Sequence, residues 1–560
     1  EAYLQATDRP FWGSGKNKSC EKTVWKHAVQ AEAATNDDEV VACVQWDATK
    51  YYESFCLKTL EVRCLVSGVP RAIVKVAANH WRSARLLRWD DSYSTTAVFT
   101  DFGLPAGSKF NDVFVRGYAL APFEEFCRIC PRVTLSNIVD DSSLICMGPR
   151  KQVKEDLLVA VGTFHKVITE ELMVGLAYDK LATCASEAAL AEELKASFQT
   201  FAGEASTALV ATGIDFAPGS RRGVVKRQWR LRNMIDRKTR IQKAKAALPR
   251  KKDRMRRIDR CGMMPAAIYG AAVNGLDNNE WLLLRKKMLA GYSYTRATSH
   301  VIKLIVEGDD TWRAAMAPAL MLQQVYWEAV TNAMGAILSL QALMQLWDKV
   351  LPSCVKDWKS STGPLDRAVL CLRRIGWDAT DLHRWHNDRG EEIALAKFSP
   401  KLLANMVQQG VQRHHERKAA DKYLQGDGQM RMTADLVQQI NRSSKYDAQD
   451  KYICKMAFTG GLWTNQRLKE AGYQVEDLCP MCLQAGDTPW HRIWQCSHPL
   501  VVEARSKQAP GWLLHMVSQD PSNQCWTTGR QIHPAQVLPR PALSIDVITR
   551  NAWGNRIAMS

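Results

Sequence analysis

Residues 40–47, VVACVQWD, are the stretch on which the fold of this chain depends. The seven residues before Asp47 form a short apolar run, which predicts a buried strand that ends at a carboxylate. A second apolar stretch, 132–147, carries Val139-Asp140-Asp141-Ser142 at its centre and predicts a hairpin with acids near its apex. Acids at the ends of adjacent strands can converge on divalent metals, and their hard oxygen ligands suit Mg²⁺.

The flanking segments extend this core into a mixed α and β domain. Helical periodicity is expected over 51–66, 111–127 and 153–172, and further strands over 93–99, 176–186 and 211–216. The resulting order, β, α, β, α, hairpin, α, β, β, predicts the α+β class, with helices packed against a sheet. Beyond Pro218-Gly219 the pattern becomes mostly helical.

The acidic pair at 140–141 indicates little by itself. The chain has three other Asp-Asp pairs, at 37–38, 90–91 and 309–310, and Asp is common in turns for local reasons. The surrounding motifs carry the argument instead.

Five motifs resemble, in the expected order, motifs A to E of reverse transcriptases, most closely those of non-LTR (LINE-like) retrotransposons. They are WDATKYY at 46–52, GLPAGS at 103–108, IVDD at 138–141, GLAYDK at 175–180 and TGIDF at 212–216. The resemblance implies a right-hand polymerase palm with partial fingers, followed by a mostly helical thumb and connector and a small zinc-binding module. The activity implied is RNA-directed DNA polymerisation, with an RNA template, a DNA primer and deoxynucleotide triphosphates as partners.

The resemblance also implies roles for single residues. Asp47 and Asp140 would hold two catalytic Mg²⁺ ions, with Asp141 beside them. Lys180 would donate a proton to the leaving pyrophosphate. Tyr52 would exclude a ribose 2′-hydroxyl, and Gly107 and Ser108 would lie near the template and the incoming nucleotide.

Three departures from the family pattern leave an alternative open. Ala106 stands where the family has Gln, Ile138 stands where it has an aromatic residue, and only 46 residues precede Asp47. We therefore expect an N-terminally truncated protein with a remnant of the fingers. The alternative is a catalytically inactive, polymerase-derived nucleic-acid-binding protein.

The net charge of +17 is concentrated in one segment. Residues 221–260 hold 18 Lys or Arg and three Asp, which gives 18 − 3 = +15 in forty residues. Such clustered cations favour contact with a phosphate backbone, although a solvated helix or a surface for an acidic protein remains possible. The expected contact residues are Arg221, Arg222, Arg230, Arg237, Arg240, Lys251 and Arg254. The adjoining stretch 256–270, RRIDRCGMMPAAIYG, resembles the start of the thumb in the same elements.

The spacing Cys479-x2-Cys482-x8-His491-x4-Cys496 predicts one structural Zn²⁺ site. It resembles the zinc segment that follows the polymerase region in non-LTR elements. Accidental spacing is the alternative, and His498 is a possible substitute ligand.

These features predict six segments and an intracellular location. With 16 cysteines and no apparent secretory signal, reduced thiols are expected, and nuclear and cytoplasmic residence without membrane attachment follows. The predicted segments are a fingers remnant at 1–39, the palm at 40–217, a basic thumb at 218–300, a helical connector at 301–455, the zinc module at 456–505 and a weakly structured tail at 506–560.

Overall fold

The computed structural model describes residues 2–105, 108, 110–198, 203–219, 222–247, 258–289, 300–424, 430–509, 511–521 and 531–534. The chain divides into two compact units that do not follow the order of the sequence. Unit 1 comprises Glu1–Arg237, Met263–Asn278 and Arg313–Ala404. Unit 2 comprises Lys238–Gly262, Asn279–Trp312 and Asn405–Ser560.

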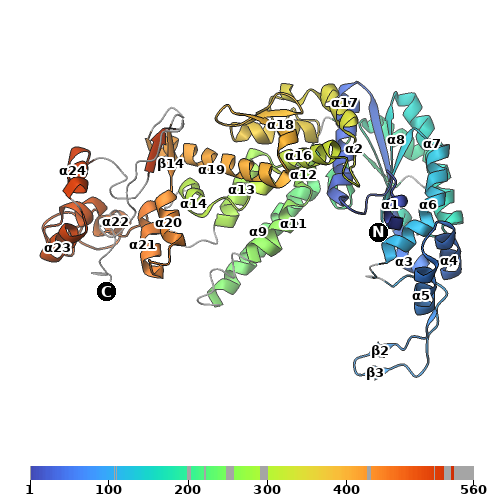
Figure 1. Ribbon diagram of the computed structural model, residues 1–560, viewed down its shortest axis with the longest axis horizontal. Helices are drawn as coiled ribbons and strands as arrows, with labels where there is room; N and C mark the ends of the chain where they lie inside the picture. The colour runs from blue at the N-terminus through green and yellow to red at the C-terminus, as the bar shows by residue number, and fades with distance from the viewer. Residues whose placement is uncertain are drawn as a thin grey trace. The chain divides into compact units, whose positions relative to one another are not determined.

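The centre of unit 1 is a six-stranded sheet in which β1 is a central strand (Figure 1). The order β4-β5-β1-β7-β8 places the predicted hairpin directly beside β1, and β6 pairs with the end of β1. The α+β expectation is thus confirmed for this unit. The strands are β1 Val40–Thr49, β4 Val133–Ile138, β5 Asp141–Gly148, β6 Gly175–Leu176, β7 Ala182–Ala185 and β8 Glu204–Ser206.

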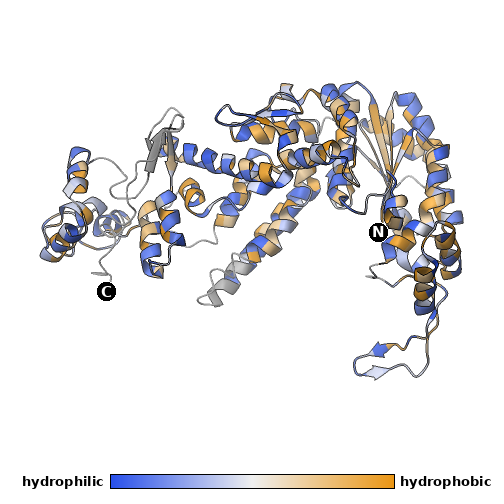
Figure 2. Ribbon diagram, viewed as in Figure 1, coloured by the Kyte–Doolittle hydropathy of each residue, from blue (hydrophilic) through white to orange (hydrophobic). Residues whose placement is uncertain are grey.

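Strand β1 is buried on both faces, which explains why its sequence is a continuous apolar run. Val44 and Trp46 belong to the core cluster that includes Phe164 of α7, and the rings of Trp46 and Phe164 lie 5.6 Å apart. Figure 2 shows apolar residues concentrated in these strands. The helices that pack against β1 or its hairpin include α2 Cys20–Asn36, α6 Asn111–Ile129 and α7 Arg150–Lys166.

Several predicted elements differ from those observed. The helix expected over 51–66 is broken into α3 Tyr51–Ser54 and α4 Leu57–Val66. The break arises because Phe55 is extended and its carbonyl accepts a hydrogen bond from Gly103 N, at 2.9 Å. The strand expected over 176–186 is interrupted by the short helix η2 Tyr178–Lys180.

The strand expected over 93–99 is largely absent. Instead, β2 Arg88–Trp89 and β3 Ser92–Tyr93 form a short hairpin at the far end of α5 Arg71–Arg82 (Figure 1). The apolar residues that suggested a strand are solvent-exposed here, with Tyr93 61% exposed and Phe99 70% exposed. Apolar composition therefore did not mark a buried strand in this segment.

Further helices of unit 1 contact α2. The contacting helices are α12 Ala271–Asn274, α17 Leu340–Val350 and α18 Pro364–Arg374. A buried ion pair joins Lys22 Nζ of α2 to Glu328 Oε1 of α16 Ala317–Val330, at 2.5 Å. The predicted fingers remnant is thus built into the core of this unit.

The segment expected to be a helical connector also contains a sheet. Three short antiparallel strands, β11 Asp378–Ala379, β12 Arg384–His386 and β13 Glu392–Ala394, interrupt the helices. The two-residue to three-residue strands are too short to show a period in the sequence.

Unit 2 is mostly helical. Its core includes Ile302 and Ile305 of α14 His300–Glu307 together with Phe458 of α21 Ala448–Phe458. The predicted weakly structured tail contributes α24 Gly511–Gln519 and β15 Gln531–Pro534, which pairs with β14 Met430–Thr433. Across the described residues of both units, no helix combines the length and the hydropathy needed to cross a bilayer.

Candidate active site and metal centre

The three predicted acidic residues meet at one end of the sheet in unit 1. Asp47 of β1 pairs directly with Asp141 of β5, and Ala48 N donates to Asp140 O at 3.3 Å. Asp140 itself occupies the turn between β4 and β5. The sheet therefore brings together acids that are more than ninety residues apart in the sequence.

The turn that carries Asp140 has an unusual backbone. Ile138 pairs with Asp141, so the hairpin loop has two residues, and Val139 in it has φ 60°. A β-branched residue in the left-handed region is strained, and such strain is typical of functional turns. The buried Asn137 holds the turn, because its Nδ2 donates to Val139 O at 3.2 Å and to Ser142 Oγ at 2.9 Å.

Lys180 reaches the same acids from the other side of β1. Ala177 N donates to Asp47 O at 2.9 Å, which anchors the segment that leads into η2. Lys180 Nζ then lies 2.6 Å from Asp47 Oδ2, although the lysine side chain is 63% exposed. The hydrogen bond to Asp47 raises the pKa of Lys180, so the ammonium form is favoured.

The acids influence each other's ionisation. Burial, followed by the charges of Asp140 and Asp47, raises the pKa of Asp141 to about 6, and Lys180 opposes the shift. Carboxylates that repel one another in this way form a suitable site for a cation, which would relieve the repulsion. Their oxygen donors match the preference of Mg²⁺.

A cavity of about 660 Å³ opens on these side chains. Besides Asp47, Asp140, Asp141 and Lys180, it is lined by Gln45 and Cys20 and by Val210, Thr212 and Gly213. The last three come from the hairpin of β9 Leu209–Ala211 and β10 Ile214–Phe216, which falls where the fifth motif was predicted. Gln45 was missed, but it lies two residues before Asp47 and so shares its face of the strand. Cys20 carried no sequence signal.

Of the predicted nucleotide-binding residues that the structure describes, neither Tyr52 nor Ser108 lines this cavity. Tyr52 accepts a hydrogen bond from Leu104 N at its carbonyl, at 2.7 Å. Burial, followed by the charges of Asp112 and Asp140, raises the pKa of Tyr52. Ser108 lies just before α6, where its carbonyl accepts from Asn111 N at 3.2 Å. Gly107 lies outside the described residues.

The predicted basic surface is only partly exposed. Arg222 Nη2 lies 2.7 Å from Asp277 Oδ2, and Arg230 Nη1 donates to Gly213 O at 2.6 Å. These two arginines therefore make contacts within unit 1, which differs from the phosphate contact expected for them. Arg237 and Arg240 are exposed on α9 Val225–Ala247. The physical reason is that α9 also carries buried residues, so its basic residues divide between an inner and an outer side. Arg221, Lys251 and Arg254 lie outside the described residues.

The predicted zinc ligands form a compact cluster in unit 2. The ligand atoms of Cys479, Cys482, His491 and Cys496 all lie within 4.8 Å of one another. Within the described ranges this is the only group of three or more His, Cys, Asp or Glu side chains that is placed to hold a metal ion. His498 is not part of the cluster.

The distance between two ligand atoms and the ionisation of Cys482 suit zinc, whereas burial raises the pKa of Cys496 to about 11. Cys479 Sγ and Cys496 Sγ are 4.0 Å apart, near the ~3.8 Å expected for two ligands at a tetrahedral Zn–S distance of about 2.3 Å. Hydrogen bonding from the Gln484 backbone, opposed by burial and aided by His491, lowers the pKa of Cys482 to about 6. Thiolate is the form that binds zinc. Four protein ligands leave no open position, which is typical of a structural site.

Comparison with known proteins gives no family assignment. No model of a protein family matches the chain, and no curated protein matches it. One similar solved structure is apo telomerase from Candida tropicalis truncated from its C-terminal domain, with 11% identity, a TM-score of 0.28, and coverage of 39% of this chain and 41% of that one. Another is apo telomerase from the same organism, with 9% identity, a TM-score of 0.30, and coverage of 66% and 56%. This chain thus spans less than two thirds of either.

Proposed function

We propose that this chain is a nucleotidyltransferase of the reverse-transcriptase type, which extends a DNA primer on an RNA template with deoxynucleotides. The observation that carries the proposal is the pairing of Asp47 with Asp141, with Asp140 in the adjoining turn and Lys180 beside them on one cavity. The order of the five sequence motifs supports the same reaction. A retrotransposon origin is part of this proposal and rests on the sequence resemblance alone.

The residues at this site would have different roles in the reaction. Asp47 and Asp140 would hold two Mg²⁺ ions, which supply charge stabilisation for the attacking and leaving oxygens when bound. The primer 3′-hydroxyl loses its proton to solvent, and its oxygen bonds to the α-phosphorus of the nucleotide as the bond to pyrophosphate breaks. Lys180, kept protonated by its pKa, would give its proton to the leaving pyrophosphate.

The zinc cluster would have a separate, structural role. Cys479, Cys482, His491 and Cys496 would hold one Zn²⁺ that ties the segment 456–505 together. A closed site of this kind contributes folding free energy and takes no part in nucleotide transfer.

Primer extension on an RNA template with Mg²⁺ and deoxynucleotides tests the proposal. Asp140→Asn should abolish extension, whereas Asp38→Asn should leave it unchanged, since Asp38 is an exposed member of another Asp-Asp pair. Extension that persists in Asp140→Asn would refute the assignment of the site.

Ala106 and Ile138, which replace family residues in the second and third motifs, favour a second candidate. This candidate is a protein that binds nucleic acid and does not copy it. Retained duplex binding without extension in the unmodified chain would establish it over the polymerase.

A further inference from the structure

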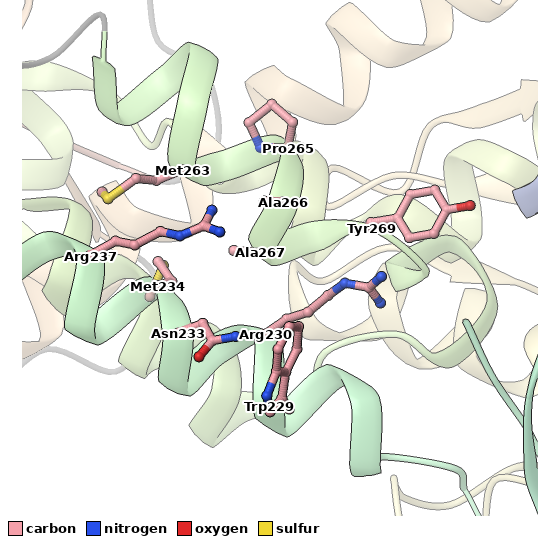
Figure 3. Close-up of a pocket in the computed structure, with 10 residues that line it drawn as sticks. All are labelled: Trp229, Arg230, Asn233, Met234, Arg237, Met263, Pro265, Ala266, Ala267 and Tyr269. Atoms are coloured by element: carbon pink, nitrogen blue, oxygen red, sulfur yellow. The ribbon is translucent and has the colours of Figure 1, made fainter. Parts of the chain in front are cut away.

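A second pocket in unit 1 lies between α9 and α11 Met264–Ile268 and has a volume of about 270 Å³ (Figure 3). None of its lining residues belongs to the cavity with the carboxylates. Its volume is just below the range of about 300–1,000 Å³ that is usual for small-molecule sites, so it suits one planar ring system.

The walls of this pocket, called here the α9–α11 groove, combine apolar and polar groups. Met234, Met263 and Ala267 are buried and provide an apolar floor. Trp229 is 52% exposed and provides an aromatic surface at the rim. A large aromatic side chain left half exposed beside an apolar floor is a favourable surface for stacking.

Two polar side chains of the groove are available to a ligand. Figure 3 shows Arg237 reaching from α9 toward Ala266 and Ala267, with Asn233 between Arg237 and Arg230. Within the part of the chain that the structure describes, neither the Asn233 amide nor the Arg237 guanidinium has a hydrogen-bond or ion-pair partner. By contrast, Arg230 is held by Gly213 O and lies over the Tyr269 ring, with Cζ 4.9 Å from the centroid.

The charge of the groove indicates an anionic ligand. Its described lining has two arginines and no acidic residue. Lys226 adds a further cation, with Nζ 4.5 Å from the Trp229 ring centroid. An apolar protein segment would gain nothing from these cations, whereas a nucleic-acid strand offers both a ring to stack and a phosphate to pair.

We propose that the α9–α11 groove binds a single unpaired base of a nucleic-acid strand. The base stacks on Trp229 above the methionine floor, the Asn233 amide hydrogen-bonds its edge, and Arg237 pairs with a phosphate. A base within a duplex presents only its edge, so a groove of this size selects unpaired strands. The inference rests on the proposed function only in taking nucleic acid as the partner.

Fluorescence anisotropy of the full chain with a labelled single-stranded RNA tests this, in parallel with an abasic strand of equal length. Trp229→Ala should weaken binding of the RNA about five- to tenfold without changing binding of the abasic strand or the dependence on salt. Arg237→Gln should weaken binding of both strands and reduce the slope of log affinity against log salt concentration by about 0.7. Trp89→Ala and Lys195→Gln, which alter exposed residues elsewhere in unit 1, are the matched controls.

A filling variant gives an independent result. Ala266 is exposed at the groove, so Ala266→Leu should not disturb folding and should reproduce the effect of Trp229→Ala. The proposal would be overturned if Trp229→Ala weakened binding of the RNA and of the abasic strand equally, or if Ala266→Leu bound the RNA as the unmodified chain does. The groove would then be a phosphate contact or a protein-docking surface.

Primer extension measured on the same samples separates the two proposals. Base-dependent binding without extension by the unmodified chain would support the groove and refute the polymerase. Extension by the unmodified chain, with no base-dependent binding, would refute the groove alone.

Discussion

Asp47 stands directly opposite Asp141 in the antiparallel ladder of β1 and β5. Like charges on directly paired residues destabilise a sheet. The ladder nevertheless forms because its central pairs, from Ala42 with Cys146 to Val44 with Leu144, are apolar and buried. Unfavourable local interactions that the surrounding core compensates are typical of functional sites.

The ion pair between Lys180 and Asp47 gives the first prediction. If Lys180 acts as a proton donor, Lys180→Ala should slow single-nucleotide incorporation about a hundredfold and leave duplex binding unchanged. Lys180→Arg keeps the positive charge but is a weaker proton donor, so it should restore only part of the rate. A pH–rate profile would detect the loss of the proton donor. Lys166→Ala, an exposed lysine of α7, is the control. An unchanged rate in Lys180→Ala would remove Lys180 from the mechanism.

The buried amide of Asn137 predicts a coupled loss of stability and activity. Asn137→Ala removes the donor to Val139 O and Ser142 Oγ, and we expect it to cost about 1–3 kcal/mol of unfolding free energy. Because the strained turn is then unsupported, extension should fall as well. Thr134→Ala, at a half-buried position of β4, should change neither the free energy of unfolding nor primer extension. Chemical denaturation and primer extension provide the two measurements.

The Cys/His cluster predicts one zinc per chain. Cys479→Ser and His491→Ala should lose the metal by elemental analysis, whereas His498→Ala and the exposed Cys261→Ser should retain it. Chelation should lower the melting temperature, because zinc binding contributes to folding. Full zinc in His491→Ala would show that His498 or another group replaces this ligand.

The two kinds of basic residue on and before α9 should behave differently. Arg240→Gln, on the exposed side, should reduce the salt dependence of duplex binding by nearly one unit of slope. Arg222→Gln should leave that slope unchanged and lower the melting temperature, because Arg222 pairs with Asp277 inside unit 1. A reduced slope in Arg222→Gln would show that it contacts phosphate as well.

His27 in α2 predicts a loss of stability in acid. Burial, followed by the charge of Lys26, lowers the pKa of His27 from 6.5 to about 3. Between these pH values the unfolded chain takes up a proton that the folded chain does not. The free energy of unfolding therefore decreases as the pH is lowered, by up to about 1.4 kcal/mol per pH unit. The decrease in melting temperature from pH 7 to pH 5 should be smaller in His27→Gln. In His515→Gln, where the ring is exposed, it should match that of the unmodified chain.

Much of the candidate site could be read from local sequence patterns. The strand before Asp47, the hairpin around Asp140 and the spacing of Cys479 and Cys482 are short-range features. These features depend on the hydrophobic period and the ligand spacing of neighbouring residues alone. The strand and the hairpin were therefore predicted where the structure has them, and the two cysteines were predicted to lie in one cluster. The basic composition of 221–260 was likewise evident.

Only packing between distant segments decided the rest. Gln45 and Cys20 line the cavity, and Lys180 reaches Asp47, because β1, α2 and η2 are brought together by the core of unit 1. The side of α9 that is buried depends on what covers it, so composition could not show that Arg230 of α9 binds Gly213 O. The same holds for Arg222, which precedes α9 and pairs with Asp277. The exposed β2–β3 hairpin shows the converse, since an apolar segment is a buried strand only where a sheet is present to pair with it.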